Sequence, residues 1–89
     1  MLSLDLSKEA YHFIKALQAK QFKQVASKIF ELLNEPRPQD FSQLKGFSYL
    51  RADVGEYRII YEQKETVLRV IIIGKRNDDE VYKKLKNLV

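Results

Sequence analysis

The first part of the chain places apolar residues first at alternating positions and then at helical spacing. Leu2, Leu4 and Leu6 alternate with polar residues, which predicts a short strand with one buried face. Ser7 follows as a suitable N-cap, and a first helix is predicted over about 8–19 by the stripe Ala10, Phe13, Ile14 and Leu17. The same spacing predicts a second helix over about 21–34 by Val25, Ala26, Ile29, Leu32 and Leu33. The short link at 19–21 favours an αα-hairpin.

The second part of the chain changes to strand patterns. Pro36 and Pro38 end the second helix. Three strands are predicted over 47–53, 57–62 and 67–73, and the short turns between them favour an antiparallel meander. The last of these runs is apolar throughout, as in a strand that is buried on both faces.

Alternation assigns residues to the two faces of this meander. Leu50 and Ala52 are expected to face the core, whereas Tyr49, Arg51 and Asp53 face the other side. In the next strand, the alternation places Arg58 and Ile60 opposite the set Tyr57, Ile59 and Tyr61.

The C-terminal segment predicts a last helix with a thin apolar stripe, Val81, Leu85 and Leu88. A helix of about three turns with so few anchors is marginal on its own. The predicted fold class is therefore α+β in one domain, 1–89, in the order short N-terminal strand, αα-hairpin, three-stranded antiparallel meander and weak C-terminal helix. The hairpin is expected to cover one face of the sheet, and the opposite face is expected to stay open.

Composition narrows the chemistry. The chain has no cysteine and one histidine, His12, so disulfides and thiol catalysis are excluded and neither a zinc site nor a cofactor is expected. No apolar run reaches the roughly 20 residues that cross a bilayer, and the N-terminus lacks a secretory pattern. We therefore expect a cytoplasmic protein without a membrane partner.

The charge is modestly positive and unevenly distributed. Sixteen Lys plus Arg oppose twelve Asp plus Glu, for a net charge of +4, and most of the excess lies after residue 44. Such an excess favours polyanions, including nucleic acid, but is also typical of an ordinary solvated surface.

The residues expected on the open face are mostly cations and phenols. Guanidinium groups bind phosphate through paired hydrogen bonds and stabilise the charge of a phosphoryl transition state, and aromatic rings stack on unpaired bases. A metal-free ribonuclease, in which the 2′-hydroxyl of the RNA attacks the adjacent phosphate, needs this set and a group that moves protons. The set consists of Lys45, Tyr49, Arg51, Arg58, Arg76 and Tyr82, and Lys75 beside Arg76 is expected to line the same positively charged surface.

Each of these residues also has a purely structural explanation. The arginines could be ordinary ion-pair partners of Asp53, Glu56 or Asp78. Tyr57 and Tyr61 are expected to be core rings, and His12 is expected to be structural or on the surface.

Three stretches of the sequence resemble the RelE branch of the RelE/ParE toxin superfamily of toxin–antitoxin systems. They are Leu44–Gly46, Arg51–Tyr61 and Ile73–Tyr82, which carry the patterns Y-R-I-I-Y, G-K-R and E-V-Y in the family's order. The resemblance covers nearly the whole chain. It implies a small α+β toxin that cleaves mRNA in the ribosomal A site without a metal and is neutralised by a RelB-like antitoxin.

The resemblance also implies roles for single residues. Arg58 matches the arginine that contacts the scissile phosphate, Arg76 the arginine that stabilises or protonates the leaving group, and Tyr82 the tyrosine that stacks on a base. The sequence departs from the family where Tyr49 and Arg51 replace a pair of lysines, one of which is the proposed general base. Arginine is a poor proton acceptor, with a pKa above about 12.

The proton acceptor therefore stays open. Tyr49, Tyr82 and Glu56 are candidates, and the ribosome could instead activate the 2′-hydroxyl mainly by alignment. Lys45, Tyr49 and Lys75 are expected to bind substrate.

The predicted function is a ribosome-dependent mRNA endoribonuclease that inhibits translation, and any contact with DNA would be made through the antitoxin. Two alternatives remain: a ParE-like inhibitor of DNA gyrase, and a catalytically weak homologue that only binds nucleic acid.

Overall fold

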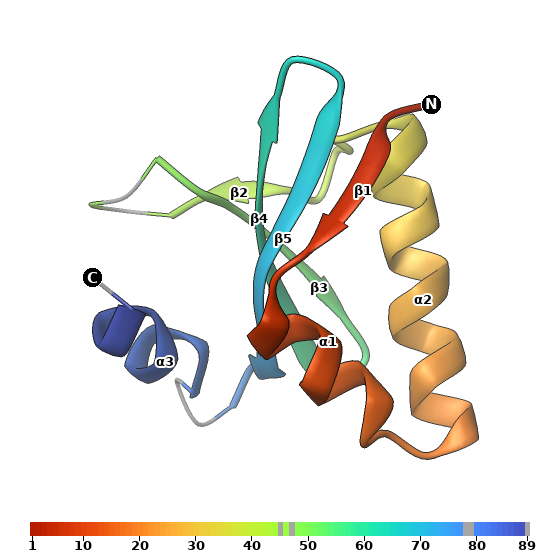
Figure 1. The fold of residues 1–89 in the computed structure, drawn as a ribbon, viewed down its shortest axis with the longest axis vertical. Helices are drawn as coiled ribbons and strands as arrows, with labels where there is room; N and C mark the ends of the chain where they lie inside the picture. The colour runs from red at the N-terminus through yellow and green to blue at the C-terminus, as the bar shows by residue number, and fades with distance from the viewer. Residues whose placement is uncertain (45, 47, 78–79, 89) are drawn as a thin grey trace.

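The computed structural model describes residues 1–44, 46, 48–77 and 80–88, so Lys45 and Asp78 lie outside the described residues. The predicted α+β class is confirmed (Figure 1). The elements in chain order are β1 (Ser3–Leu6), α1 (Lys8–Lys15), α2 (Ala19–Asn34), β2 (Ser42–Gln43), β3 (Leu50–Val54), β4 (Tyr57–Lys64), β5 (Val67–Lys75) and α3 (Glu80–Leu88). None of the helices in this described part is long and apolar enough to cross a membrane.

The five strands form one mixed sheet in the order β1-β5-β4-β3-β2. The antiparallel meander β3-β4-β5 is confirmed. Two pairings go beyond the prediction, because β1 lies parallel to β5 and the short β2 lies antiparallel to β3. Ser7 fixes the first of these pairings. Its Oγ accepts the Ala10 N–H at 3.0 Å as the N-cap of α1 and donates to the Ile71 carbonyl of β5 at 2.6 Å.

The αα-hairpin is confirmed, but its loop lies earlier than predicted. The first helix ends at Lys15 instead of 19, and the second begins at Ala19 instead of 21. The backbone of Gln18 is extended and its carbonyl accepts the Phe22 N–H at 2.8 Å, so Gln18 is the N-cap of α2. The third strand also differs, because β3 covers Leu50–Val54 instead of 47–53.

The larger core lies between the helical hairpin and the sheet. Both predicted core tyrosines belong to it, with Tyr57 6% exposed and Tyr61 fully buried. The Tyr61 hydroxyl donates to the Pro36 carbonyl at 2.6 Å, and burial raises the pKa of Tyr61 to about 12. The helical members of this core are Ala10, Ile14, Val25, Ile29, Leu32 and Leu33.

The prediction of an open second face is wrong, because α3 packs on it. Figure 1 shows α3 on the side of the sheet away from α1 and α2. The physical reason is that β4 and β5 carry apolar residues on both faces, and these need a second cover. The resulting smaller core comprises Leu44, Ile60, Ile71, Ile72, Val81 and Leu85.

The contact between α3 and β5 is close. A Cβ added at Gly74 of β5 would lie 3.1 Å from Cγ1 of Val81 on α3. Val81 and Leu85 are 0% and 1% exposed, so these two members of the predicted stripe are buried, and the side chain of Leu88 lies outside the described part of the structure. Glu80 adds a polar anchor, because its carboxylate accepts the Lys75 N–H at 3.0 Å.

Candidate functional site

Three of the predicted site residues meet at one oxygen atom. Arg51 on β3, Arg58 on β4 and Tyr82 on α3 lie on the face of the sheet that α3 covers. The Tyr82 hydroxyl oxygen accepts a hydrogen bond from Arg51 Nη1 at 2.7 Å and another from Arg58 Nη1 at 3.2 Å. We call these three residues, together with Asp53, the arginine–tyrosine cluster.

Asp53 holds the other edge of the Arg58 guanidinium. The two residues lie directly opposite each other on β3 and β4. Arg58 Nε donates to Oδ1 of Asp53 at 2.8 Å, and Nη2 donates to Oδ2 at 3.2 Å. The Arg58 side chain is only 13% exposed and that of Asp53 31%. For Arg58, therefore, the expected ion pair with Asp53 exists, and it lies inside the candidate site.

The pair stays charged. Burial raises the pKa of Asp53, but the hydrogen bonds from Arg58 and the charges of Arg58, Arg76 and Arg51 outweigh burial and hold the pKa below its ordinary value. The hydrogen bonds to Asp53 raise the pKa of Arg58 further. The cluster thus presents two guanidinium cations around one carboxylate.

Arg76 lies outside the cluster, at its edge. Its Nη1 donates to the Gly55 carbonyl at 3.2 Å, and its backbone N–H donates to the Glu56 carbonyl at 2.9 Å. Gly55 has a φ of 57°, the left-handed conformation that glycine adopts readily in the β3–β4 turn. Arg76 is exposed, and its charge reaches Asp53.

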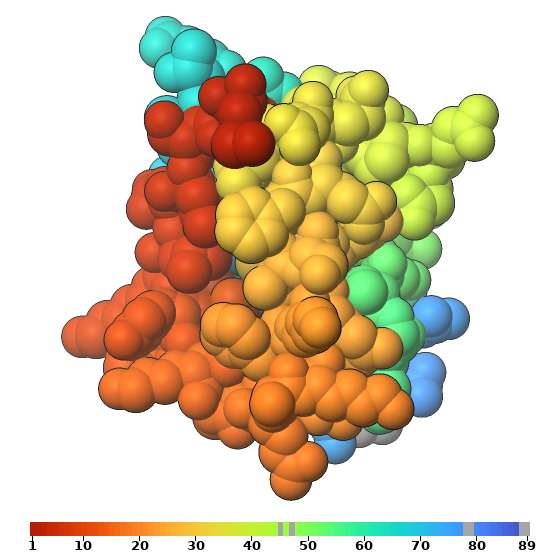
Figure 2. Space-filling view, turned by 90° about the vertical axis from the view of Figure 1, so that its right-hand side faces the viewer, coloured from red at the N-terminus to blue at the C-terminus, as the bar shows by residue number. Residues whose placement is uncertain are grey.

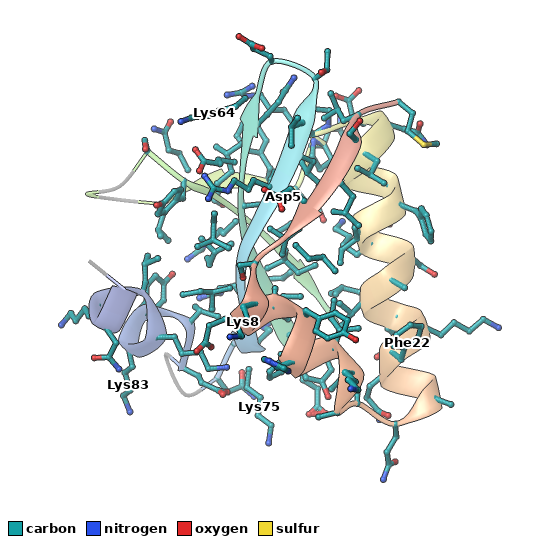
Figure 3. All side chains as sticks on the ribbon, viewed as in Figure 1. Asp5, Lys8, Phe22, Lys64, Lys75 and Lys83 are labelled. Atoms are coloured by element: carbon teal, nitrogen blue, oxygen red, sulfur yellow. The ribbon has the colours of Figure 1, made fainter. Side chains whose placement is uncertain are left out.

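The other predicted site residues lie in different surroundings or outside the described residues. Lys75 is exposed at the end of β5 and points away from the sheet (Figure 3). Tyr49 is partly buried against the smaller core, and Lys45 lies outside the described residues. His12 is on the surface of α1, with its ring 5.6 Å from that of Tyr11.

The cluster is equipped to bind a phosphate. Two guanidinium groups that converge on one oxygen would make the same contacts with a phosphate oxygen. A proton acceptor is harder to find. Arg51 is a cation, both oxygens of Asp53 are engaged by Arg58, and Glu56 is exposed in the turn. In the described part of the chain, no three His, Cys, Asp or Glu side chains are grouped so that they could hold a metal ion.

An apolar groove on the other side of the molecule was not predicted. It has a volume of about 430 Å³ and lies between β1, α1 and α2, on the face that Figure 2 shows. Leu4 is 43% exposed in this groove. The prediction that Leu4 faces the core with Leu2 and Leu6 is therefore wrong, and the reason is that β1 is an edge strand of the sheet. The aromatic residues Tyr11, Phe22 and Phe30 lie off the core stripes of their helices, which is the signal that could have revealed the groove. The lining residues are Leu4, Leu6, Tyr11, Ile14, Phe22, Ala26, Ile29 and Phe30.

Comparison with known proteins identifies the family. The family described as ParE toxin of type II toxin–antitoxin system, parDE, matches residues 4–80. The structure of the isolated E. coli RelE toxin is similar over 100% of both chains, with 25% identity and a TM-score of 0.76. No curated protein sequence matches the chain.

Two toxin–antitoxin complexes contain chains with the same fold. A chain of the intact E. coli RelBE complex aligns with 86% of this chain and 99% of its own length, at 24% identity and a TM-score of 0.75. A chain of the archaeal RelE–RelB complex from Pyrococcus horikoshii OT3 aligns with 86% of this chain and 97% of its own length, at 22% identity and a TM-score of 0.74. The chain therefore belongs to the ParE toxin family of the RelE/ParE superfamily and is a toxin of a type II toxin–antitoxin system with a RelE-like fold.

Proposed function

We propose that this toxin is a metal-independent, ribosome-dependent endoribonuclease that cleaves mRNA in the A site and so inhibits translation. The observation that carries the proposal is the convergence of Arg51 and Arg58 on one oxygen, at 2.7 and 3.2 Å. Donors fixed in advance around the position of a developing negative charge are the most effective electrostatic catalysts. Residues 1–89 act in this proposal as one toxin domain.

The proposed reaction is an internal transfer of the phosphate. The 2′-oxygen of the RNA forms a bond to phosphorus and loses its proton, and the bond from phosphorus to the 5′-oxygen breaks as that oxygen gains a proton. Arg58 and Arg51 stabilise the charge on the non-bridging oxygens, and Arg76 at the edge of the cluster stabilises the leaving oxygen. Lys45, Tyr49 and Lys75 add contacts to the substrate. The proton acceptor is Tyr49, Tyr82 or Glu56, or alignment on the ribosome replaces a strong base.

Tyr82 has two parts in this mechanism. In the free protein its hydroxyl occupies the position in which a phosphate oxygen would accept from Arg51 and Arg58. Substrate binding therefore exchanges one acceptor for another, and it releases the phenol ring to stack on a base. Stacking of a base on an aromatic ring contributes about 1–3 kcal/mol.

We further propose an antitoxin of the RelB kind as the partner. The chains of similar fold in the E. coli and P. horikoshii complexes support this partner. The apolar groove beside β1 offers a surface for an amphipathic helix, with Phe30 61% and Phe22 47% exposed. Acidic residues of the partner would neutralise the arginines, and DNA would be bound only through the antitoxin.

A second candidate function is inhibition of DNA gyrase, which the match to the ParE family favours. A gyrase inhibitor would leave mRNA intact and provoke a DNA-damage response. The two half-buried arginines around Tyr82 are unexplained by that function. A third candidate, a homologue that binds nucleic acid without cleaving it, would bind with strong salt dependence and give no product.

Primer extension on ribosome-bound mRNA after induction tests the proposed function. The parent should leave cuts within codons in the reading frame. The double variant Arg58→Ala, Arg76→Ala should reduce cleavage at least about 100-fold, because it removes guanidinium groups that donate hydrogen bonds to the phosphate. Arg69→Ala, which changes an exposed arginine paired with Asp5 and Glu62 on the sheet, is the matched control and should cleave like the parent. A double variant as toxic as the parent would refute the proposal.

A further inference from the structure

We infer that Asp53 is a positioning residue of the reaction, which orients Arg58 so that a single edge of its guanidinium meets the phosphate. This inference rests on the proposed function. It concerns a residue for which the resemblance implies no role, and which the sequence offers only as an ordinary ion-pair partner.

The geometry leaves Arg58 one free edge. A guanidinium carries five N–H donors in a rigid plane: one on Nε and two on each terminal nitrogen. Asp53 engages Nε at 2.8 Å and Nη2 at 3.2 Å. Three N–H groups remain, one on Nη2 and two on Nη1, and one from each nitrogen lies on the Nη1–Nη2 edge. Nη1 already donates to the Tyr82 hydroxyl. A phosphate that replaces this hydroxyl therefore meets a fork of two parallel donors instead of a freely rotating cation.

The sheet holds the backbone positions of Asp53 and Arg58. Asp53 and Arg58 are cross-strand partners in the register of β3 and β4, between the buried pair Ala52 and Ile59 and the pair Val54 and Tyr57. Both side chains therefore start from paired strand positions, with a further strand pair on either side. A group on packed strands is held more exactly than a group on a loop.

Asp53 also stabilises the half-buried Arg58 cation when no phosphate is bound. Arg58 is 13% exposed, and a cation at this depth without a partner is disfavoured. Besides Arg58, the charged groups that act on Asp53 are Arg51 on its own strand and Arg76 beyond β5, and both are positive. One carboxylate among three cations leaves an excess of positive charge for the phosphate.

The opposing possibility is that Asp53 competes with the phosphate for Arg58. The two possibilities predict opposite signs for Asp53→Asn. A competitor, once removed, would leave cleavage unchanged or increase it. A positioning residue, once removed, lets Arg58 rotate, and misplacement of a catalytic group by about 1 Å can cost about 100-fold in rate.

Single-turnover cleavage of mRNA on programmed ribosomes, measured over a range of toxin concentrations, separates rate from binding. We expect Asp53→Asn to lower the saturating rate at least about 10-fold, with less than about a threefold change in the half-saturating concentration. Asp53→Glu, which restores the carboxylate, should recover part of the rate. Asp5→Asn removes the partner of Arg69 on β1 and is the matched control, with no change expected.

Arginine side-chain NMR of the same proteins, without ribosomes, provides an independent readout. The Nε–H signal of Arg58 should be sharp and protected in the parent and in Asp5→Asn, and it should broaden or exchange rapidly in Asp53→Asn. An unchanged or increased rate in Asp53→Asn, or an unchanged Arg58 signal, overturns the positioning role. If the parent fails to cleave while its Arg58 signal still depends on Asp53, the proposed function fails and the orientation of Arg58 by Asp53 stands.

Discussion

The two faces of the sheet are built differently. The helical face joins two helices to four strands through a continuous apolar core, and it includes the fully buried Leu32 and Tyr61. The face under α3 has a smaller core, in which the described helix contributes Val81 and Leu85. Beside that smaller core lie two arginines, a carboxylate and a phenol.

The larger core on the helical face therefore supplies most of the stability, and the candidate site lies on the other face. The helical face can hold the strands in register while side chains on the other face exchange partners. In the proposed mechanism the Tyr82 phenol gives up two hydrogen bonds when substrate binds, and such a site is best covered by an element with few anchors. The helix α3, which closes the site, is thus expected to open more readily than the helical face.

The largest expected effect is a core truncation that compares the two faces. Leu32→Ala should lower the free energy of unfolding by about 3 kcal/mol, because it leaves a cavity in the larger core. Leu85→Ala should instead raise amide hydrogen exchange in α3 and lower the global free energy of unfolding by about 1 kcal/mol or less. Urea unfolding and exchange mass spectrometry measure both. Equal global losses would show that α3 and the helical face unfold as one unit.

A change of cation on the α3 face should have the next largest effect. Arg58→Lys keeps the charge but loses the paired bonds to Asp53 and the contact with Tyr82, so the single-turnover cleavage rate should fall about 100-fold. The control is Arg69→Lys on β5, where the side chain is 50% exposed, and it should leave the rate unchanged. A lysine variant that cleaves at the parent rate would show that positive charge alone is sufficient.

A charge placed in the apolar groove should affect the partner and spare the chemistry. Phe30→Asp should weaken binding of the antitoxin about 30-fold, which corresponds to about 2 kcal/mol for a well-packed aromatic anchor. Ser27→Asp adds the same charge to an exposed position of α2 outside the groove and should bind normally. Calorimetric titration measures the affinity, and primer extension should show parent-like cleavage by both variants.

The smallest expected effect is a loosening of α3 in acid. The Lys75 N–H, with help from Lys84, holds the pKa of Glu80 below its ordinary value of 4.5, although burial opposes this. A lowered pKa stabilises the fold above the ordinary value, and this stabilisation is lost as the pH falls through the folded-state value. Protection factors in α3 should therefore drop below about pH 4.5 before those in α2 do. In Glu80→Gln this pH dependence should be absent, and a persistent dependence would assign it to another group, such as Asp53.

Local patterns predicted much of this fold. Most residues of the two predicted helical stripes are in the core, with Phe13 and Leu17 packed against it, but Ala26 lines the apolar groove. Alternation in β4 placed Arg58 and Ile60 opposite Tyr57, Ile59 and Tyr61, as the two cores show. These successes depend on periodicity alone, which the chain displays within a few residues. The convergence of Arg51 and Arg58 followed from the same alternation once the register of β3 and β4 was known.

The errors came from contacts between distant parts of the chain. The parallel pairing of β1 with β5 depends on residues far apart in sequence, and no local pattern encodes that register. The cover of α3 over the second face depends on a glycine, Gly74, that lets the helix approach the strand. Lys28 gave no signal either: it is 7% exposed and bonded to Asp40 at 3.1 Å, in a helix where it reads as a surface residue.

The pairing of the first strand with the last has a kinetic side. Ser7 and Ile71 are bonded across 64 positions, so this edge of the sheet can close only after β5 has been synthesised. Contacts of such long range slow folding. Until they form, the leucines of β1 and the apolar faces of both helices stay exposed to solvent. A chain interrupted before Val67 would lack the partner of β1 altogether. An incomplete translation product of this toxin is thus expected to be an aggregation-prone fragment instead of a partly active toxin.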